Sequence, residues 1–247
     1  MDLKLIIGVV IVVIILYIIW SYFFTSMEVL MSFQDAAVSK SVALTSIDSS
    51  KSNYSFSAWT YINDWGTNYG KRKNILVIPD GASSFYYFAL YFSETTNNLE
   101  IYVRTQDDIT TTNSYTTDGG ITATCNVTNF PLQTWVNISI SVYNRAIDVY
   151  IDGKLIKTCS MTNVARPIPT GKSIYIGGDI ASSSKLPGFS GYIASVLYNS
   201  EVFSPKEAWD IYARGYNNSA FDLNVLKRYK LQMSFLKDNS VLKQFSI

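Results

Sequence analysis

The chain has 247 residues, of which 48% are hydrophobic and 15% aromatic, enough for one large domain with short attachments. Its 20 Lys and Arg residues nearly balance its 19 Asp and Glu residues, so no overall charge favours a nucleic-acid partner. It contains no histidine, which excludes His-based zinc sites and Ser-His-Asp triads.

The N-terminal segment has the composition of a membrane span. Leu5 to Trp20 are apolar throughout, and about 20 helical residues cross the hydrocarbon core of a bilayer. Trp20 and Tyr22 lie where interfacial aromatic residues are expected, and no small-residue cleavage site follows them. We therefore expect residues 1–24 to form a retained single-pass anchor that contacts lipid through residues 3–24, rather than a cleaved signal peptide.

Two features indicate the side of the membrane on which the rest of the chain lies. Lys4 precedes the span and the next basic residue is Lys40, so the positive-inside rule places the N-terminus in the cytoplasm. The remainder would then lie at the cell surface or on a lumenal face. Four glycosylation sequons agree with that side, although an Asn-, Ser- and Thr-rich chain also produces such triplets by chance: Asn53, Asn126, Asn137 and Asn217.

After the span, the sequence predicts an all-β domain. Residues 25–52 are small and polar, as expected for either a stalk or an edge strand. "YSFSAWTYI" and "NILVIPDG" read as strands, and "SFYYFALYF" and "LEIYVRT" flank "SETTNN" in a hairpin pattern. The clearest strand is "WVNISISV", in which Val136, Ile138 and Ile140 alternate with polar residues. Many short strands at this spacing indicate a sandwich or barrel.

The pattern changes near the C-terminus. "SIYIGGD" and "FSGYIASVLYN" are two further strand patterns. A short helix is expected near 204–214, with Ser204 and Glu207 as a capping box and Gly215 as its stop. Residues 216–247 return to alternation and predict a basic hairpin that completes or flanks the sandwich.

The segment "YNRAIDVYIDGKLIKTC" contains two aspartates that could belong either to a site or to a hairpin. Asp152-Gly153 is a favoured dipeptide for a two-residue hairpin turn. Asp148 lies on the polar face of the preceding strand, as a solvated residue would. The pattern therefore favours a hairpin over a catalytic or metal-binding pair.

Four segments follow one another in a specific order: "FSAWTYI", "PLQTWVNISISVYNRAIDVYIDGKLIKTC", "IYIGG" and "FSGYIASVLYNSEVFSPKEAWDIYARG". This order resembles the concanavalin A-like lectin/glucanase superfamily, in its laminin-G-like branch, over residues 53–215. The resemblance implies a jelly-roll sandwich of two antiparallel sheets with a face that binds sugars in many members. The hairpin with its flanking Cys125 also resembles lectin-like proteins of large icosahedral DNA viruses.

Catalysis and metal binding are not expected. Glucanases of this superfamily carry an E-x-D-x-x-E pattern that places two carboxylates about 5 Å apart, and none of the five glutamates here is followed two residues later by Asp. Calcium would need a denser set of oxygen ligands than the scattered candidates provide, so no cofactor is expected: Asp80, Asp107, Asp108, Asp118 and Asp179.

Cys125 and Cys159 are the only cysteines and bracket the predicted hairpin. A bond between them would close a loop of roughly 35 residues and contribute about 4 kcal/mol in the chain-entropy model. Two buried thiols are the alternative, and the sequence leaves both open.

Exposed aromatic residues beside amides are the usual means by which lectin-like sandwiches hold sugars. We expect such a site in two loops, the first with Trp65 and Tyr69 and the second with Asn113, Tyr115 and Asp118. Trp209 and Tyr212 of the predicted helix are expected to pack on the sandwich.

Two functions agree with these features, and neither is enzymatic. The first is a membrane-anchored structural protein that docks to neighbouring proteins, such as a minor capsid protein that ties a virion's inner membrane to its shell. The second is a membrane-anchored carbohydrate receptor or adhesin.

Overall fold

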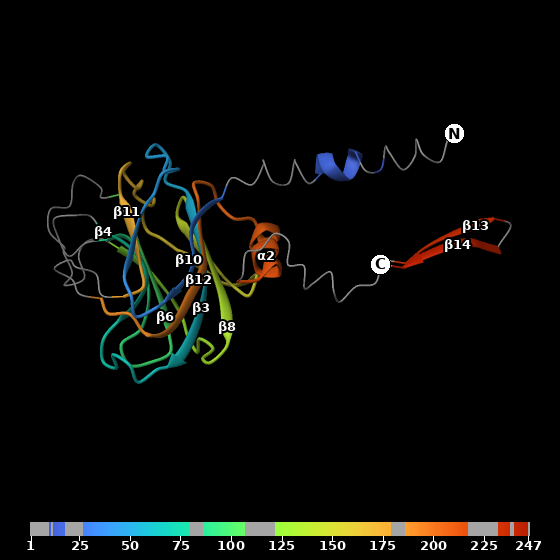
Figure 1. Ribbon diagram of the computed structural model, residues 1–247. Coiled ribbons are helices and arrows are strands. Elements are labelled where there is room, and N and C mark those ends of the chain that lie inside the picture. Colours follow the sequence, from blue (N-terminus) through green and yellow to red (C-terminus); the bar gives the residue numbers. More distant parts are fainter. Residues whose placement is uncertain are drawn as a thin grey trace.

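The computed structural model describes residue 10 and residues 12–17, 27–79, 86–106, 122–178 and 186–216, together with the backbone of two strands within 232–246. Its body is a sandwich of two six-stranded sheets, in which all neighbouring strands pair antiparallel (Figure 1). The all-β sandwich expected from the sequence is thereby confirmed.

Sheet A has the strand order β1-β12-β3-β8-β9-β10. Its strands are β1 (Glu28–Asp35), β12 (Ser190–Asn199), β3 (Tyr54–Asp64), β8 (Trp135–Tyr143), β9 (Ala146–Ile151) and β10 (Lys154–Ser160). Sheet B has the order β2-β11-β4-β5-β6-β7. Its strands are β2 (Lys40–Ala43), β11 (Ser173–Ile176), β4 (Lys73–Pro79), β5 (Tyr86–Phe92), β6 (Leu99–Arg104) and β7 (Thr122–Val127).

The core lies between the two sheets, because alternate residues of each strand point inward. Val136, Ile138 and Ile140 of β8 are at most 1% exposed, as the alternation predicted. Phe56 of β3 stacks on Phe88 of β5 with ring centroids 4.6 Å apart, which joins the sheets at the centre. Burial of each such side chain stabilises the fold by about 1.5–3 kcal/mol relative to exposure.

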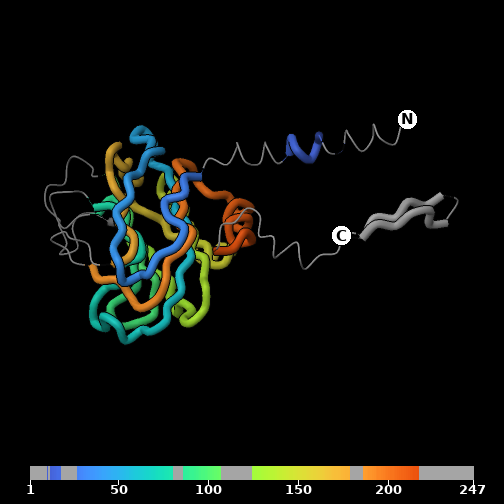
Figure 2. The backbone as a smooth tube through the Cα atoms, in the orientation of Figure 1, coloured from blue at the N-terminus to red at the C-terminus, as the bar shows by residue number. Residues whose placement is uncertain are grey.

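The segment that the sequence left open as stalk or edge strand forms strands. It contributes β1 to one edge of sheet A and β2 to one edge of sheet B. Figure 2 shows this early part of the chain beside the late strand β12, with which β1 pairs. The sandwich therefore begins before residue 53, the boundary that the sequence suggested.

The predicted helix is confirmed as α2 (Pro205–Arg214). The Ser204 side chain accepts a hydrogen bond from the Glu207 backbone N–H, and the Glu207 carboxylate accepts one from the Ser204 N–H at 2.7 Å. Pro205 starts the helix and Gly215 ends it. The helix lies against the side of sheet A that faces away from the core (Figure 1).

The predicted C-terminal hairpin is also present, as β13 (Gln232–Lys237) paired with β14 (Ser240–Ser246). Within the described residues it forms a sheet of its own and pairs with neither sheet of the sandwich.

The predicted membrane anchor cannot be followed as one helix. Residues 12–17 are helical, whereas Leu5, Trp20 and Tyr22 lie outside the described residues. In the part of the chain that the structure describes, no helix has both the length and the apolar character needed to cross a bilayer.

Candidate functional site

The outer face of sheet A carries a row of aromatic residues across three adjacent strands. Tyr192 of β12 lies directly opposite Tyr61 of β3, and Tyr61 lies directly opposite Trp135 of β8. Residues that face each other across antiparallel strands project from the same side of the sheet. The register alone therefore brings these three rings together on one surface.

Two further rings extend the row. Phe33 of β1 stacks against Tyr192 with centroids 5.4 Å apart, and Tyr216, which follows α2, stacks on Trp135 at 4.4 Å. Within the row, Tyr61 lies 5.6 Å from Trp135 and 6.4 Å from Tyr192. We call these five residues the aromatic platform: Phe33, Tyr61, Trp135, Tyr192 and Tyr216.

The aromatic platform is accessible to solvent. Phe33 is 56% exposed, Tyr192 43% and Tyr216 41%. Single exposed apolar side chains are common on protein surfaces, but a contiguous group of large ones marks an interaction surface. Because tyrosine and tryptophan combine a flat apolar ring with a polar tip, such a surface suits ligands that are themselves amphipathic.

Helix α2 explains why the platform occupies only one end of this face. Under the helix, the outward positions of β3 and β8 hold buried small polar residues, including Ser57 and Ser139, and one buried ring, that of Trp59. Ser57 Oγ lies 2.9 Å from Ser139 Oγ, and the Asn137 amide donates to Ser57 Oγ at 3.1 Å. The outward side chains of the sheet are thus mostly small where α2 packs on them, and the exposed aromatic rings lie beyond the end of the helix.

The contact between α2 and the β9–β10 turn is close. A Cβ added to Gly153 would lie 3.0 Å from Trp209 Cα and 3.1 Å from Tyr212 Cβ. Tyr212 in turn stacks on Trp59 at 5.7 Å with ring planes 18° apart. The expectation that the helical aromatics pack on the sandwich holds for Tyr212, whereas Trp209 remains 48% exposed.

The structure does not place the predicted ligand residues on the platform. Trp65 packs against the core, edge-on to Phe92 at 5.9 Å, and the Lys73 ammonium lies 4.4 Å from its ring centroid. The Trp65 ring is thus only partly exposed, with the Lys73 cation over it, and a ligand-binding role for Trp65 stays a prediction. Tyr69 is 62% exposed on the same loop. Asn113, Tyr115 and Asp118 lie outside the described residues.

Lys73 is itself fully buried under that loop. Burial lowers the pKa of its ammonium, and the Asp64 carboxylate acts in the opposite sense. The Lys73 ammonium thus stabilises the loop that contains Trp65 by a cation–π contact with the Trp65 ring.

The hairpin aspartates have structural roles, as their pattern predicted. Asp152 and Gly153 have φ values of +50° and +72°, the conformation of a type I′ turn. Asp152 Oδ1 also accepts from the Asn137 backbone N–H at 2.9 Å. Asp148 Oδ1 accepts from the Thr158 hydroxyl at 2.6 Å, across to β10.

Each of the five glutamates bonds to a neighbour within the fold. Glu28 accepts from Thr45 and Ser46, and these bonds lower its pKa although burial alone would raise it. Glu94 and Glu100 each lie 3.7 Å from the Arg72 guanidinium. Glu207 completes the helix cap.

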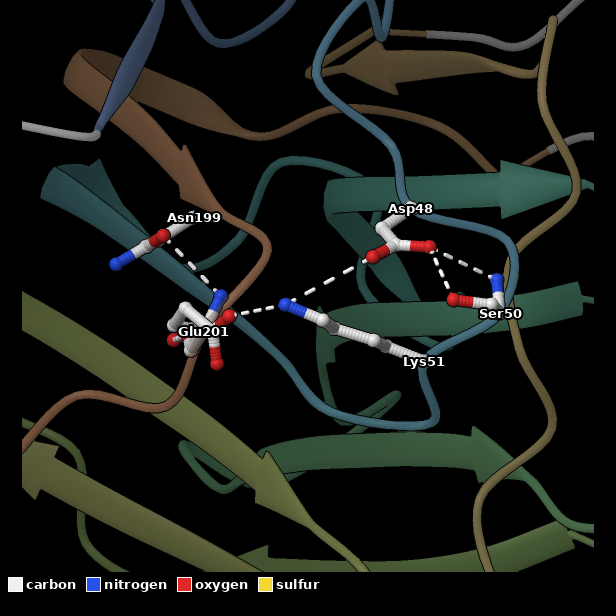
Figure 3. A network of polar contacts seen from close by, with 6 residues as sticks. Asp48, Ser50, Lys51, Asn199 and Glu201 are labelled. Carbon is white, nitrogen blue, oxygen red and sulfur yellow. Dashed lines mark hydrogen bonds and ion pairs between the residues drawn. The ribbon is translucent and has the colours of Figure 1, made fainter.

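Glu201 belongs to a polar network that joins the segment before β3 to the end of β12 (Figure 3). Lys51 lies between Glu201 and Asp48, forming an ion pair with each, and Asp48 Oδ1 accepts from the Ser50 N–H at 3.0 Å. Asn199 Oδ1 accepts from the Glu201 N–H at 3.1 Å. The network is exposed, so it fixes the local loop geometry more than it adds to stability.

Metal ligands do not gather in the described ranges, where no group of three or more Cys, Asp and Glu side chains could hold an ion. The candidate calcium ligands all lie outside those ranges: Asp80, Asp107, Asp108, Asp118 and Asp179.

The asparagines of the four glycosylation sequons have different surroundings in the structure. Asn126 is exposed on β7. Asn53 Oδ1 accepts from the Asn144 N–H at 3.1 Å, and Asn217 lies outside the described residues. Asn137 is fully buried beneath α2, so our prediction of a glycan there is wrong: the folded sheet has no room for one.

Cys125 of β7 and Cys159 of β10 form a disulfide, with Cα atoms 5.8 Å apart. Each of these strands is the last in its sheet. Of the two states that the sequence left open, the structure has the bonded one, which closes one edge of the sandwich.

The sequence did not identify the aromatic platform. Its members come from five separate segments, and no local motif links them. The available signal was strand parity: Tyr61 and Trp135 occupy the outward positions of their strands, where a surface residue would ordinarily be polar.

Comparison with known proteins agrees with this architecture. Residues 35–208 match the model of a family described as the concanavalin A-like lectin/glucanases superfamily. No curated protein matches the chain in sequence.

Several solved structures share the fold at low sequence identity. The ligand-binding domain of botulinum neurotoxin serotype D, in complex with N-acetylneuraminic acid, has a TM-score of 0.52 and 14% identity, over 76% of this chain and 46% of that one. The binding domain of botulinum neurotoxin DC, in complex with rat synaptotagmin II, has a TM-score of 0.51 and 13% identity, over 76% and 46%. A Trypanosoma rangeli sialidase reaches 0.48 and 12%, over 66% and 23%. This chain thus spans less than half the length of each of these structures, and the likeness concerns the fold.

Proposed function

Because this chain belongs to the concanavalin A-like lectin/glucanases superfamily, we propose that it is a non-enzymatic lectin-like protein that binds carbohydrate on its aromatic platform. Its N-terminal segment would hold the sandwich at a membrane. The observation that carries the proposal is the cross-strand row of Tyr192, Tyr61 and Trp135, flanked by exposed Phe33 and Tyr216.

The dimensions of the row suit an oligosaccharide. From β1 to β8 the row crosses three strand spacings of about 4.8 Å, or roughly 14 Å in all. Flat rings over such a length can stack on the apolar faces of successive sugar units, whose hydroxyl groups then hydrogen-bond at the rim. One of the structural relatives was solved with a sugar acid, N-acetylneuraminic acid, which is consistent with a sugar-binding role for this fold.

We favour binding over hydrolysis for two reasons. The sequence lacks the paired-carboxylate pattern of the glucanases. In addition, each glutamate already bonds within the fold, so none is left as an evident acid or nucleophile.

The test is carbohydrate binding by the full-length chain in detergent, measured on a glycan array and then in solution. Trp135→Ala should weaken binding about tenfold or more, because it removes the ring that contacts each of the other four rings of the platform. Tyr143→Ala is the matched control, since Tyr143 is a 55%-exposed aromatic residue at the opposite end of the same strand. Equal binding by wild type and Trp135→Ala would refute the platform as the site.

A second function is favoured by a different observation. Val29, near the start of β1, and Val38, in the turn after it, are 59% and 57% exposed, so the edge of sheet A carries an exposed apolar side chain near each of its ends. Such an edge would suit a structural role in which the anchored sandwich docks to neighbouring proteins, including that of a minor capsid protein between a virion's inner membrane and its shell. Cross-linking in the native particle would test it: links from Lys40, near this edge, to another protein support docking, and links confined to this chain contradict it.

A further inference from the structure

The aromatic platform differs from the other aromatic groups in its charge environment. Among the described residues, every cation–π contact involves a ring outside the platform: Arg72 with Tyr91 and Tyr102, Lys73 with Trp65, and Arg104, Arg166 and Lys172 with Tyr87. Most of these rings belong to strands of sheet B. The cation–π contacts of the described residues thus involve rings of sheet B and Trp65, and none of them involves the row on the outer face of sheet A.

An acidic residue lies in the row itself. Asp35, the last residue of β1, is directly opposite Tyr192 and is exposed. Residues so paired have Cβ atoms about 5 Å apart. Asp35 is also two residues after Phe33, so both side chains project from the same side of the strand.

The Asp35 carboxylate is held in place by its own turn. Its Oδ1 accepts from the Ala37 backbone N–H at 2.8 Å. The ion pairs found among the described residues all involve carboxylates other than that of Asp35. The carboxylate can therefore accept hydrogen bonds from sugar hydroxyls, while it repels any anion placed on the neighbouring rings.

We infer that the aromatic platform selects neutral carbohydrates, and that Asp35 sets this selectivity against sugars that carry carboxylate or sulfate groups. The inference rests on the proposed function. The charge acts on a ligand over the β1 and β12 end of the platform, because the screening length at physiological salt, about 8 Å, exceeds the spacing of about 5 Å between the Cβ atoms of Asp35 and Tyr192.

The experiment uses the full-length chain in detergent and neutral oligosaccharides, each compared with its sialylated or sulfated counterpart. Asp35→Asn removes the charge and keeps an oxygen for the Ala37 amide. Asp64→Asn is the matched control, because Asp64 is also exposed, ends a strand of sheet A and accepts from turn amides, at 3.1 Å from Gly66. Affinities are measured at low and at high salt.

At low salt, wild type should bind the neutral member of each pair about three- to tenfold more tightly, as expected for one charge pair near a surface. Asp35→Asn and high salt should each shrink that ratio, and Asp64→Asn should leave it unchanged. Tighter binding of the acidic members by wild type, or a ratio unchanged by Asp35→Asn, would overturn the inference.

The outcomes distinguish the inference from the function beneath it. Binding that depends on Trp135 but ignores Asp35 would keep the carbohydrate site and remove its selectivity mechanism. Binding of neither member of any pair would refute both.

Discussion

Tyr216 lies flat on Trp135, with ring centroids 4.4 Å apart and ring planes 7° from parallel. It follows Gly215, which ends α2 with φ +78° and where an added Cβ would meet nothing within 4 Å. The phenol ring therefore covers one face of the Trp135 indole and is joined to the helix through a residue with unusual conformational freedom.

Removing that ring should expose Trp135. Because Tyr216 is part of the aromatic platform, we expect Tyr216→Ala to weaken carbohydrate binding by about two- to tenfold, through loss of aromatic contact worth about 0.5–1.5 kcal/mol. Acrylamide should also quench the tryptophan fluorescence more strongly than in wild type. Tighter binding would show that Tyr216 competes with the ligand for the Trp135 ring instead of contacting the ligand, and Tyr143→Ala should change neither measurement.

Gly153 controls how closely α2 approaches the sheet. Gly153→Ala should lower the free energy of unfolding by about 2–4 kcal/mol, since the strained φ of +72° and the 3.0 Å contact with Trp209 both oppose a side chain. Gly171→Ala isolates the backbone contribution, because Gly171 has φ +77° with nothing within 4 Å, and should cost only about 1 kcal/mol. Denaturant unfolding measures both, and equal losses would mean that the helix contact contributes nothing.

The Cys125–Cys159 disulfide should stabilise the sandwich by closing its edge. Reduction is expected to lower the free energy of unfolding by about 4 kcal/mol, from the entropy regained by the unfolded chain. Urea unfolding with and without reductant measures this loss. The double variant Cys125→Ser/Cys159→Ser should match the reduced wild type and should not respond to reductant; a response would point to an effect unrelated to this bond.

Buried tyrosines make the fold sensitive to alkali. Burial raises the pKa of Tyr198 to about 12 and raises that of Tyr54 as well. In the unfolded chain a tyrosine ionises near 10, so above that pH the unfolded state loses protons that the folded state retains. The free energy of unfolding should therefore fall as pH rises from about 10 to 12, by up to about 1.4 kcal/mol per pH unit for each group.

Tyr198→Phe tests whether the ionisation of Tyr198 contributes to this loss of stability at alkaline pH. It should flatten part of that decline in denaturant unfolding between pH 9 and pH 12, from about one unit below the ordinary pKa of tyrosine to the raised pKa of Tyr198. Tyr143→Phe, at an exposed tyrosine, should retain the slope. An unchanged slope in Tyr198→Phe would assign the alkaline loss to other groups.

Local sequence signals predicted local structure well. Ser204 and Glu207 form the expected capping box, and Asp152-Gly153 forms the expected turn. In each case the interacting groups lie within four residues of one another, so the pattern contains both partners. The local sequence did not show the burial of Asn137 or the partial burial of Trp65, because their surroundings come from distant segments. Helix α2 covers Asn137, and Phe92 and Lys73 contact Trp65.

The all-β sandwich, its helix and its hairpins can be predicted from the sequence alone, because strand alternation and turn-forming residues depend only on residues that are close together in the chain. The order of the segments also identified the family. The position of the aromatic platform, in contrast, depends on the tertiary structure, because cross-strand register sets Tyr192 beside Tyr61 and Tyr61 beside Trp135. The packing of α2 then leaves one part of that face open, since the helix covers the small residues of the sheet together with Trp59 and ends before the exposed rings.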